Sequence, residues 1–299
     1  MSYRIAIALI AFRAFAEETH SWSDFWNSFT IRSHGDIEFS DDDRDIRKIS
    51  PGGYLIIEER RFLSFRTLEI RPEERSYTIG WRERPFDATA KAWLEQALPR
   101  VIRNTGAGAE GRSRRILAKS GPAGVLDEIS RIESSGAKSV YFRELFASGK
   151  LDSEMLRRAA RQIAREIHSD GSKARLLGVV APPYLASEDL LGPYFQAVDS
   201  IRSDGEQQRL LADLLDRLEA TPGLIRYVLK SAGRISSDGE KARILIAVAQ
   251  SRRTADDLLR PNFFQAANTI QSDGERRRVL TAVLERSDLS RESMSQALR

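Results

Sequence analysis

The sequence contains no cysteine and only three histidines, His20, His34 and His168. Without cysteine the chain has no disulfide framework and no thiolate that could act as a nucleophile or a metal ligand. Protein zinc sites are built mainly from cysteine and histidine, and three scattered histidines do not form a histidine-rich site. Disulfide-stapled folds, thiol catalysis and cysteine- or histidine-based metal centres are therefore excluded.

The chain also lacks the short motifs of common enzyme classes. It contains no H-E-x-x-H, no G-x-x-x-x-G-K-[ST] and no G-x-S-x-G. The glycine-rich stretch 106–111 is the nearest approach to a phosphate-binding loop, but it follows a predicted helix rather than a strand, so it indicates a helix end. We therefore predict a protein that is not an enzyme and that carries no cofactor or metal.

Neither sign of charge dominates the composition. The chain has 47 Lys and Arg against 43 Asp and Glu, which leaves a net charge of +4 over 299 residues. A strong nucleic-acid binder usually has a more lopsided basic face. Nucleic-acid binding is therefore the alternative function here rather than the leading one. The chain is long enough for two domains with a buried core.

Long apolar runs are missing, and we predict no transmembrane span. The N-terminal run 5–12 is too short to cross a bilayer as a helix. It follows Arg4 and precedes Ala14-Phe15-Ala16, an outline that resembles a secretory signal peptide with its cleavage site. We interpret segment 1–27 as either such a signal or a helix that docks on the fold. The first interpretation favours a periplasmic or cell-envelope location, and the second a cytoplasmic one.

What the sequence does contain is a repeated motif. Near-copies of Ile-Ser-Ser-Asp-Gly-Glu begin at isoleucines spaced 34 or 35 residues apart, namely Ile132, Ile167, Ile201, Ile235 and Ile270. A fixed period in this range is typical of stacked helical repeats. Ser237 and Glu240 have the spacing of a capping box, in which the serine caps the helix and the glutamate accepts from the serine's own N–H. The motif therefore predicts a helix start rather than a metal or ligand site.

Each repeat is predicted to hold two helices. Ile244, Leu245 and Val248 make one apolar stripe after the cap, and Thr221-Pro222 is the expected start of a second helix. Helix pairs of this kind must stack on their neighbours to bury both stripes. We therefore predict that residues 132–299 form an α-helical repeat array, or α-solenoid.

Between residues 28 and 86 the apolar pattern alternates with a period of two, and turn residues separate the short segments. Sequential short strands with tight turns predict an antiparallel β-meander. The acidic stretch from Ser40 to Asp45 is interpreted as a solvated turn, with a calcium site as the alternative. Trp22, Trp26 and Phe29 form either a segment docked on the core or a binding patch.

Residues 87–131 are predicted to be a helical bridge between the meander and the array. Asp87 is the expected N-cap of its first helix, and Pro99 should kink that helix. Gly121-Pro122 should divide the helices that follow. The predicted fold class is therefore α+β, a small antiparallel β-meander followed by αα-hairpin repeats of about 34 residues.

Three runs of sequence resemble a known bacterial module. They are GDIEFSDDDRDIRKISPGGYLIIEE, RPFDATAKAWLEQALPRVIRNTGAGAE and ISSDGEKARIL. In this order they resemble the β-meander and HEAT-like helical repeats found near sensor-type membrane zinc metallopeptidases and in stand-alone envelope proteins. The peptidase motif does not occur in this sequence. The resemblance covers residues 28–299 and implies the architecture of a bacterial envelope protein.

We predict a non-enzymatic scaffold that binds a protein or peptide, with a basic, nucleic-acid-binding repeat protein as the alternative. One candidate set of binding residues is the arginine five positions after each repeat aspartate, Arg175, Arg209, Arg243 and Arg278. These are either solvated, cap-paired side chains or a row of cations along one edge. The second set lies in segment 287–299, interpreted as the first helix of a further repeat. Its apolar residues Leu289, Met294 and Leu298 would dock a partner's helix or a second copy.

Overall fold

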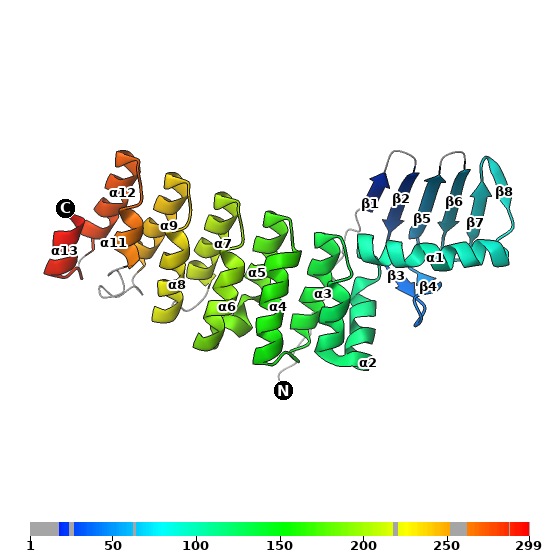
Figure 1. The fold of residues 1–299 in the computed structure, drawn as a ribbon, viewed down its shortest axis with the longest axis horizontal. Coiled ribbons are helices and arrows are strands. Elements are labelled where there is room, and N and C mark those ends of the chain that lie inside the picture. Colours follow the sequence, from blue (N-terminus) through cyan, green and yellow to red (C-terminus); the bar gives the residue numbers. More distant parts are fainter. Residues whose placement is uncertain are drawn as a thin grey trace, which may run out of the picture. The chain divides into compact units, whose positions relative to one another are not determined.

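The structure is a computed structural model that describes residues 18–23, 27–61, 64–217, 221–251, 262–286 and 288–298. The chain divides into two compact units between Arg112 and Ser113, inside the segment predicted as a bridge. The first unit contains an antiparallel sheet and the second a series of helices (Figure 1). The predicted α+β fold with a helical repeat region is thus confirmed. No helix in the described part of the chain is long and apolar enough to cross a membrane.

The sheet unit has eight described strands: β1 (Glu18–Ser23), β2 (Asn27–His34), β3 (Ile37–Phe39), β4 (Ile46–Ile49), β5 (Tyr54–Arg61), β6 (Ser64–Ile70), β7 (Arg75–Ile79) and β8 (Arg82–Arg84). Six of them form an antiparallel sheet in the order β1-β2-β5-β6-β7-β8, and β3 pairs separately with β4. The meander is therefore confirmed with one interruption, because the β3–β4 hairpin is inserted between β2 and its partner β5.

Three strands were not predicted, and each lacks the alternation on which the prediction depended. Strand β1 has the sequence ETHSWS and lies in the segment assigned to a signal or docking helix. Strand β8 is an exposed run of three charged residues. In β4 the two buried isoleucines are separated by two exposed residues, and its partner β3 has a register shift between Glu38 and Phe39. A bulge of this kind breaks the period of two.

Helix α1 (Ala88–Thr105) packs its apolar side against the sheet to form one core. Trp93 of α1 donates its indole N–H to the buried carboxylate of Glu59 on β5, at 3.0 Å. Asp87 caps the helix as predicted, since its side chain accepts from Thr89 and Ala90. The helix continues through Pro99 and ends at Gly106, whose φ of 75° is left-handed. The stretch 106–111 is therefore the helix end that the sequence predicted.

The second unit is built from paired helices: α2 (Ala109–Ile129), α3 (Ser135–Ala147), α4 (Ser153–Glu166), α5 (Asp170–Leu185), α6 (Glu188–Val198), α7 (Asp204–Arg217), α8 (Pro222–Ala232), α9 (Asp238–Gln250), α11 (Asn262–Ala267), α12 (Asp273–Leu284) and α13 (Arg291–Ala297). Helix α2 begins before the division and is broken at Gly121, as predicted. The first helices of successive repeats, α3, α5, α7, α9 and α12, pack side by side, and α4, α6, α8 and α11 form a second layer (Figure 1).

The segment after α12 was assigned to the wrong place in the repeat. Ser290 caps α13, just as Thr221 caps α8, and α13 packs against α12. Helix α13 is therefore the second helix of the repeat that begins at Ser272, and not the first helix of a further one. The error arose because a serine cap marks the start of both kinds of helix.

Only one of the two hydrogen bonds of the predicted capping box forms. Ser237 accepts from the N–H of Glu240, and Ser272 accepts from Glu275, each at 3.4 Å. The glutamate does not reach back: the carboxylate of Glu240 pairs with Arg243 at 2.9 Å, and the N–H of Ser237 donates to Asp204 of the preceding repeat at 2.7 Å. The predicted second half of the box is therefore wrong, because a carboxylate of the neighbouring repeat occupies the donor.

This geometry gives different expectations for the two capping residues. Ser237→Ala should lower the free energy of unfolding by about 1 kcal/mol, because an N-cap is lost. Glu240→Ala should cost only a few tenths of a kcal/mol, because it removes one exposed i,i+3 ion pair. Chemical denaturation of the two variants measures both values. Equal losses would contradict the described cap.

Candidate functional site

The four predicted arginines occupy the same position on α5, α7, α9 and α12. Three of them are paired with the glutamate three residues earlier on the same helix: Arg209 with Glu206 at 3.1 Å, Arg243 with Glu240 at 2.9 Å, and Arg278 with Glu275 at 2.8 Å. Each pair neutralises its own charge at the surface. For these three repeats the cap-paired interpretation is correct, and a row of free cations does not form.

Arg175 differs from the other three. Serine occupies position 172, where the other repeats have Glu206, Glu240 or Glu275. Within the described residues Arg175 forms no ion pair, and neither does Arg143 on the neighbouring helix α3. Both side chains are exposed. Among the described residues, the adjacent helices α3 and α5 therefore each carry an exposed guanidinium group without an ion-pair partner.

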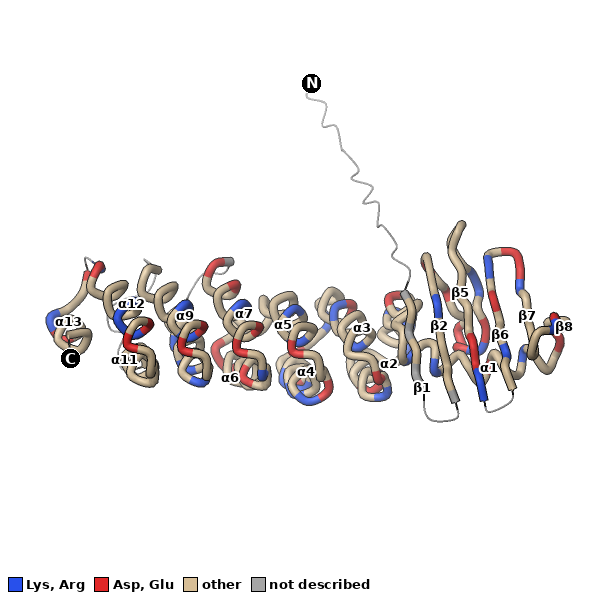
Figure 2. The backbone as a smooth tube through the Cα atoms, turned by 90° about the horizontal axis from the view of Figure 1, so that it is seen from above, with Lys and Arg blue, Asp and Glu red and all other residues tan. Residues whose placement is uncertain are grey.

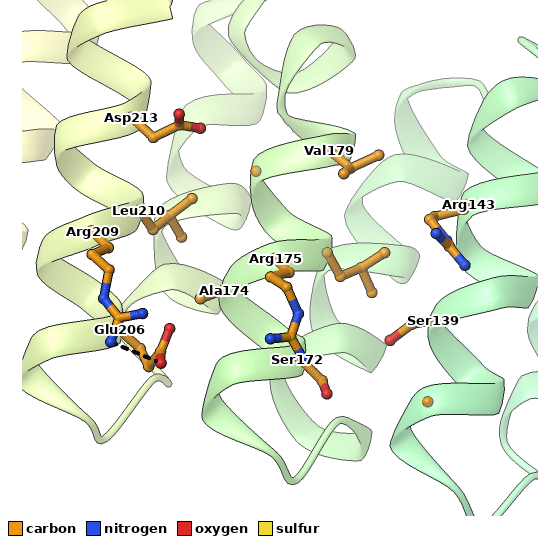
Figure 3. Close-up of a pocket in the computed structure, with 13 residues that line it drawn as sticks. Ser139, Arg143, Ser172, Ala174, Arg175, Val179, Glu206, Arg209, Leu210 and Asp213 are labelled. Carbon is orange, nitrogen blue, oxygen red and sulfur yellow. Dashed lines mark ion pairs between the residues drawn. The ribbon is translucent and has the colours of Figure 1, made fainter. Parts of the chain in front are cut away.

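These two arginines line an open groove of about 590 Å³ that extends over α3, α5 and α7. The lining residues are Gly136, Ser139, Arg143, Ser172, Ala174, Arg175, Leu176, Gly178, Val179, Glu206, Arg209, Leu210 and Asp213. Figure 3 shows Ser139 and Arg143 on one side of Val179 and Arg175, and the residues of α7 on the other. The groove thus combines free positive charge, hydroxyl groups and an apolar floor.

The floor is open because of Gly178. A Cβ atom added there would lie 3.5 Å from Leu210 Cδ1, which is ordinary contact, so the position has room for a side chain. The other repeats have Ala212, Ile246 or Thr281 at this place. Glycine inside a helix costs roughly 0.5–1 kcal/mol relative to alanine. At the next position Val179 is 60% exposed. The helix that lines the middle of the groove therefore has a smaller residue at this repeat position than the later repeats have.

The helices beneath the groove are held by two buried tyrosines. The hydroxyl of Tyr194 donates to the carbonyl of Leu177 at 2.9 Å, and that of Tyr184 donates to Leu156 at 2.8 Å. Burial raises the pKa of both hydroxyls well above the ordinary value, and the charge of Asp213 adds to the effect on Tyr194. Both tyrosines therefore remain neutral donors. Their hydrogen bonds fix α5 to α4 and α6 to α5 beneath the groove.

A ladder of aspartates joins successive repeats, and the sequence did not reveal it. Asp170 accepts from the N–H of Ser203, Asp204 accepts from Ser236 and Ser237, and Asp238 accepts from Gln271 and Ser272, at 2.7–3.1 Å. Ser135 takes the same role in the first repeat and accepts from the N–H of His168 at 3.1 Å. The aspartate of the repeated motif therefore binds the start of the next repeat. Its recurrence was visible in the sequence, but its acceptor role was not.

Buried lysines link the first helix of a repeat to the end of the second helix of the same repeat, and Lys173 also reaches Ala164 of the preceding repeat. The amino group of Lys173 donates to the carbonyl of Ala164 at 2.9 Å and to Ser200 at 3.0 and 3.2 Å, and Lys241 donates to Thr269 at 2.7 Å. Burial lowers the pKa of Lys173, partly offset by Asp170. Lys138 pairs with Glu166 at 3.0 Å. Carbonyl, hydroxyl and carboxylate oxygens accept hydrogen bonds from these buried amino groups, which offsets the cost of burying them.

The C-terminal candidates remain a prediction. Met294 is 44% exposed and Leu298 71% exposed, whereas Leu289 is half-buried. The neighbouring helix expected near Thr254 lies outside the described residues. A smaller groove of about 310 Å³ lies between α9 and α12, but its Arg278 is paired with Glu275. The structure brings none of the three apolar residues into either groove.

The acidic turn is a network of ion pairs. Asp41 pairs with Arg47 at 3.0 Å, Asp43 with Arg112 at 2.6 Å and Asp45 with Arg75 at 2.9 Å. Within the described residues no group of histidine or acidic side chains is placed to hold a metal ion.

Of the predicted aromatic cluster, Phe29 is buried in the sheet core, in line with docking on the core. The side chains of Trp22 and Trp26 lie outside the described residues. Comparison of the chain with protein families, with curated proteins and with solved structures found no match.

Proposed function

We propose that the helical repeat array is a scaffold that binds a segment of another protein in the groove over α3, α5 and α7. The observation that supports this most strongly is the groove itself. Its volume of about 590 Å³ is large enough for several side chains, and it is lined by three consecutive repeats. Repeat arrays commonly recognise extended partners through surfaces of this kind.

The groove has little that would support catalysis. Its serines have no histidine among the lining residues, and Glu206 is held by Arg209. A nucleophilic serine requires a base within hydrogen-bond reach. A binding role is therefore the simpler proposal. Its setting in the bacterial cell envelope rests on the N-terminal segment and on the resemblance, both features of the sequence.

Nucleic-acid binding is less favoured by the charge distribution. Basic and acidic residues are interspersed along the helices of the second unit (Figure 2), and three of the four recurring arginines are paired with glutamate. A nucleic-acid surface presents many unpaired cations that track the phosphate backbone. Retention on a heparin column that falls steeply with salt would favour this alternative.

A substitution that fills the groove tests the proposal. Gly178→Leu should weaken the binding of peptides selected from a display library on the wild-type protein by about tenfold or more, which corresponds to 1.4 kcal/mol. Ala212→Leu is the matched control, because Ala212 has the same repeat position one repeat later and does not line the groove. Binding is measured by fluorescence anisotropy. Equal affinity for both variants would place the binding site elsewhere.

A further inference from the structure

The repeats provide an internal reference for the groove. At the surface position of Arg175, three other repeats have an arginine neutralised by glutamate. Position 172 is serine, so Arg175 is left without an ion pair among the described residues, and Arg143 on α3 is in the same condition. Free guanidinium groups are strong hydrogen-bond donors that match the geometry of a carboxylate. Two of them beside one groove favour an anionic occupant.

Charge varies across the groove. The free arginines are on α3 and α5, whereas both acidic lining residues, Glu206 and Asp213, are on α7. Glu206 is paired with Arg209. Helix α5 packs between the other two helices. An occupant with a long row of negative charges would therefore meet carboxylates on α7. A compact acidic group placed between α3 and α5 would not.

The other lining residues indicate which kind of side chain of the occupant would lie next to its acidic group. Val179 is 60% exposed, and Gly178 leaves the floor beside it uncovered as far as Leu210. An aliphatic side chain of the occupant would remove this apolar surface from water. The hydroxyl of Ser139 already donates to the carbonyl of Ser135 at 2.7 Å, so its oxygen is available as an acceptor. The groove thus suits an acid next to an apolar residue.

We propose that the occupant is an acidic peptide segment of a partner protein, in which a glutamate or aspartate binds Arg143 and Arg175 and an adjacent aliphatic side chain covers Val179. This inference rests on the proposed function and specifies the chemistry of the ligand. The carboxylate of the occupant would pair with the two arginines that have no ion pair in the described part of the chain. Its aliphatic side chain would cover the apolar surface left exposed by Gly178 and Val179. A nucleic-acid strand fits less well because its charges repeat at every nucleotide.

Three labelled peptides of equal length test the inference. The first contains two glutamates next to a leucine in a glycine–serine background, the second has glutamine in place of glutamate, and the third has lysine. The glutamate peptide should bind at least about tenfold more tightly than the glutamine peptide, because charge-assisted hydrogen bonds contribute more than neutral ones. The lysine peptide should not bind. The preference should decrease with added salt.

The arginines are tested by matched substitutions. Arg143→Gln and Arg175→Gln should each reduce affinity for the glutamate peptide by roughly tenfold. Arg243→Gln should leave it unchanged, because Arg243 occupies the same repeat position and lies outside the groove. The double variant Arg143→Glu with Arg175→Glu should lose the glutamate peptide and acquire the lysine peptide. All these side chains are exposed, so each variant should stay folded, and thermal melting of each variant checks this.

The outcomes separate this inference from the proposed function. If the glutamate and glutamine peptides bind equally and Gly178→Leu blocks both, the groove binds peptides but the acidic assignment is wrong. If no peptide binds in a groove-dependent manner, both proposals fail. If a single-stranded oligonucleotide displaces the glutamate peptide more strongly than unlabelled peptide does, the ligand is a polyanion and the inference is overturned.

Discussion

Leu245→Ala is expected to lower the free energy of unfolding of the repeat array by about 2–5 kcal/mol, because a large side chain is removed from a packed core. Leu245 is fully buried on α9, which packs against α7, α8 and α12. The cost combines the lost burial of the side chain with the cavity left behind. Chemical denaturation measures the total effect.

The damage should be local as well as large. Repeats contact only their nearest neighbours, so hydrogen exchange should increase most in α9 and the helices that pack on it. Leu284→Ala is the control, because Leu284 on α12 is 37% exposed and should change stability much less. Uniform loosening of the whole chain in Leu245→Ala would contradict an array of nearest-neighbour contacts.

Asp238→Ala is expected to cost about 1–3 kcal/mol, since two hydrogen bonds to a charged acceptor are lost. The carboxylate accepts from the N–H groups of Gln271 and Ser272 at 3.0 and 2.8 Å. Both donors belong to the next repeat, so the loss weakens the junction between repeats. Hydrogen exchange should show reduced protection of these two amides, and denaturation should show the loss of stability.

Asp273 supplies the matched control. It occupies the same position at the start of α12, but its side chain is 96% exposed and pairs only with Arg276 in the described part of the chain. Both aspartates lie at the positive end of a helix dipole, so that contribution is common to the two variants. Asp273→Ala should therefore change stability by less than about 0.5 kcal/mol. Equal effects at both positions would mean that the ladder contributes nothing beyond the dipole.

The features predicted correctly are those that depend on residues close together in sequence. A serine cap, an apolar stripe on one helix and a glycine that ends a helix all arise within a few residues. For this reason Ser237, Thr221 and Gly106 were assigned correctly. The strands with regular alternation, such as β5 and β6, were found for the same reason.

The errors concern partners that lie outside the helix or strand in question. The N–H of Ser237 has two candidate acceptors, and local spacing pointed to Glu240 rather than to Asp204 of the preceding repeat. Strands β1 and β8 pair with the consecutive strands β2 and β7, and their own sequences carry no alternation. Pairing with a neighbouring strand need not leave a periodic signal in the strand itself.

The groove was missed because it results from small or absent side chains. The four arginines were predicted as one set, although only Arg175 has a serine at the position three residues earlier. Gly178 lies inside a helix, where a single glycine does not by itself indicate a groove. Arg143 has no arginine counterpart in the other repeats. Alignment of the repeats with one another would have shown these departures, but their meaning depends on which helices are adjacent.

The aspartate ladder also bears on how such a chain can change in length. Each rung joins one carboxylate to backbone N–H groups, and every non-proline residue has such a group. The recipient repeat therefore needs no particular side chain, and serine and glutamine both serve as donors. Duplication or deletion of one whole period would preserve every remaining rung, whereas an insertion of a few residues would break one. Gene segments that encode whole repeats are thus the natural units by which this architecture can gain or lose length.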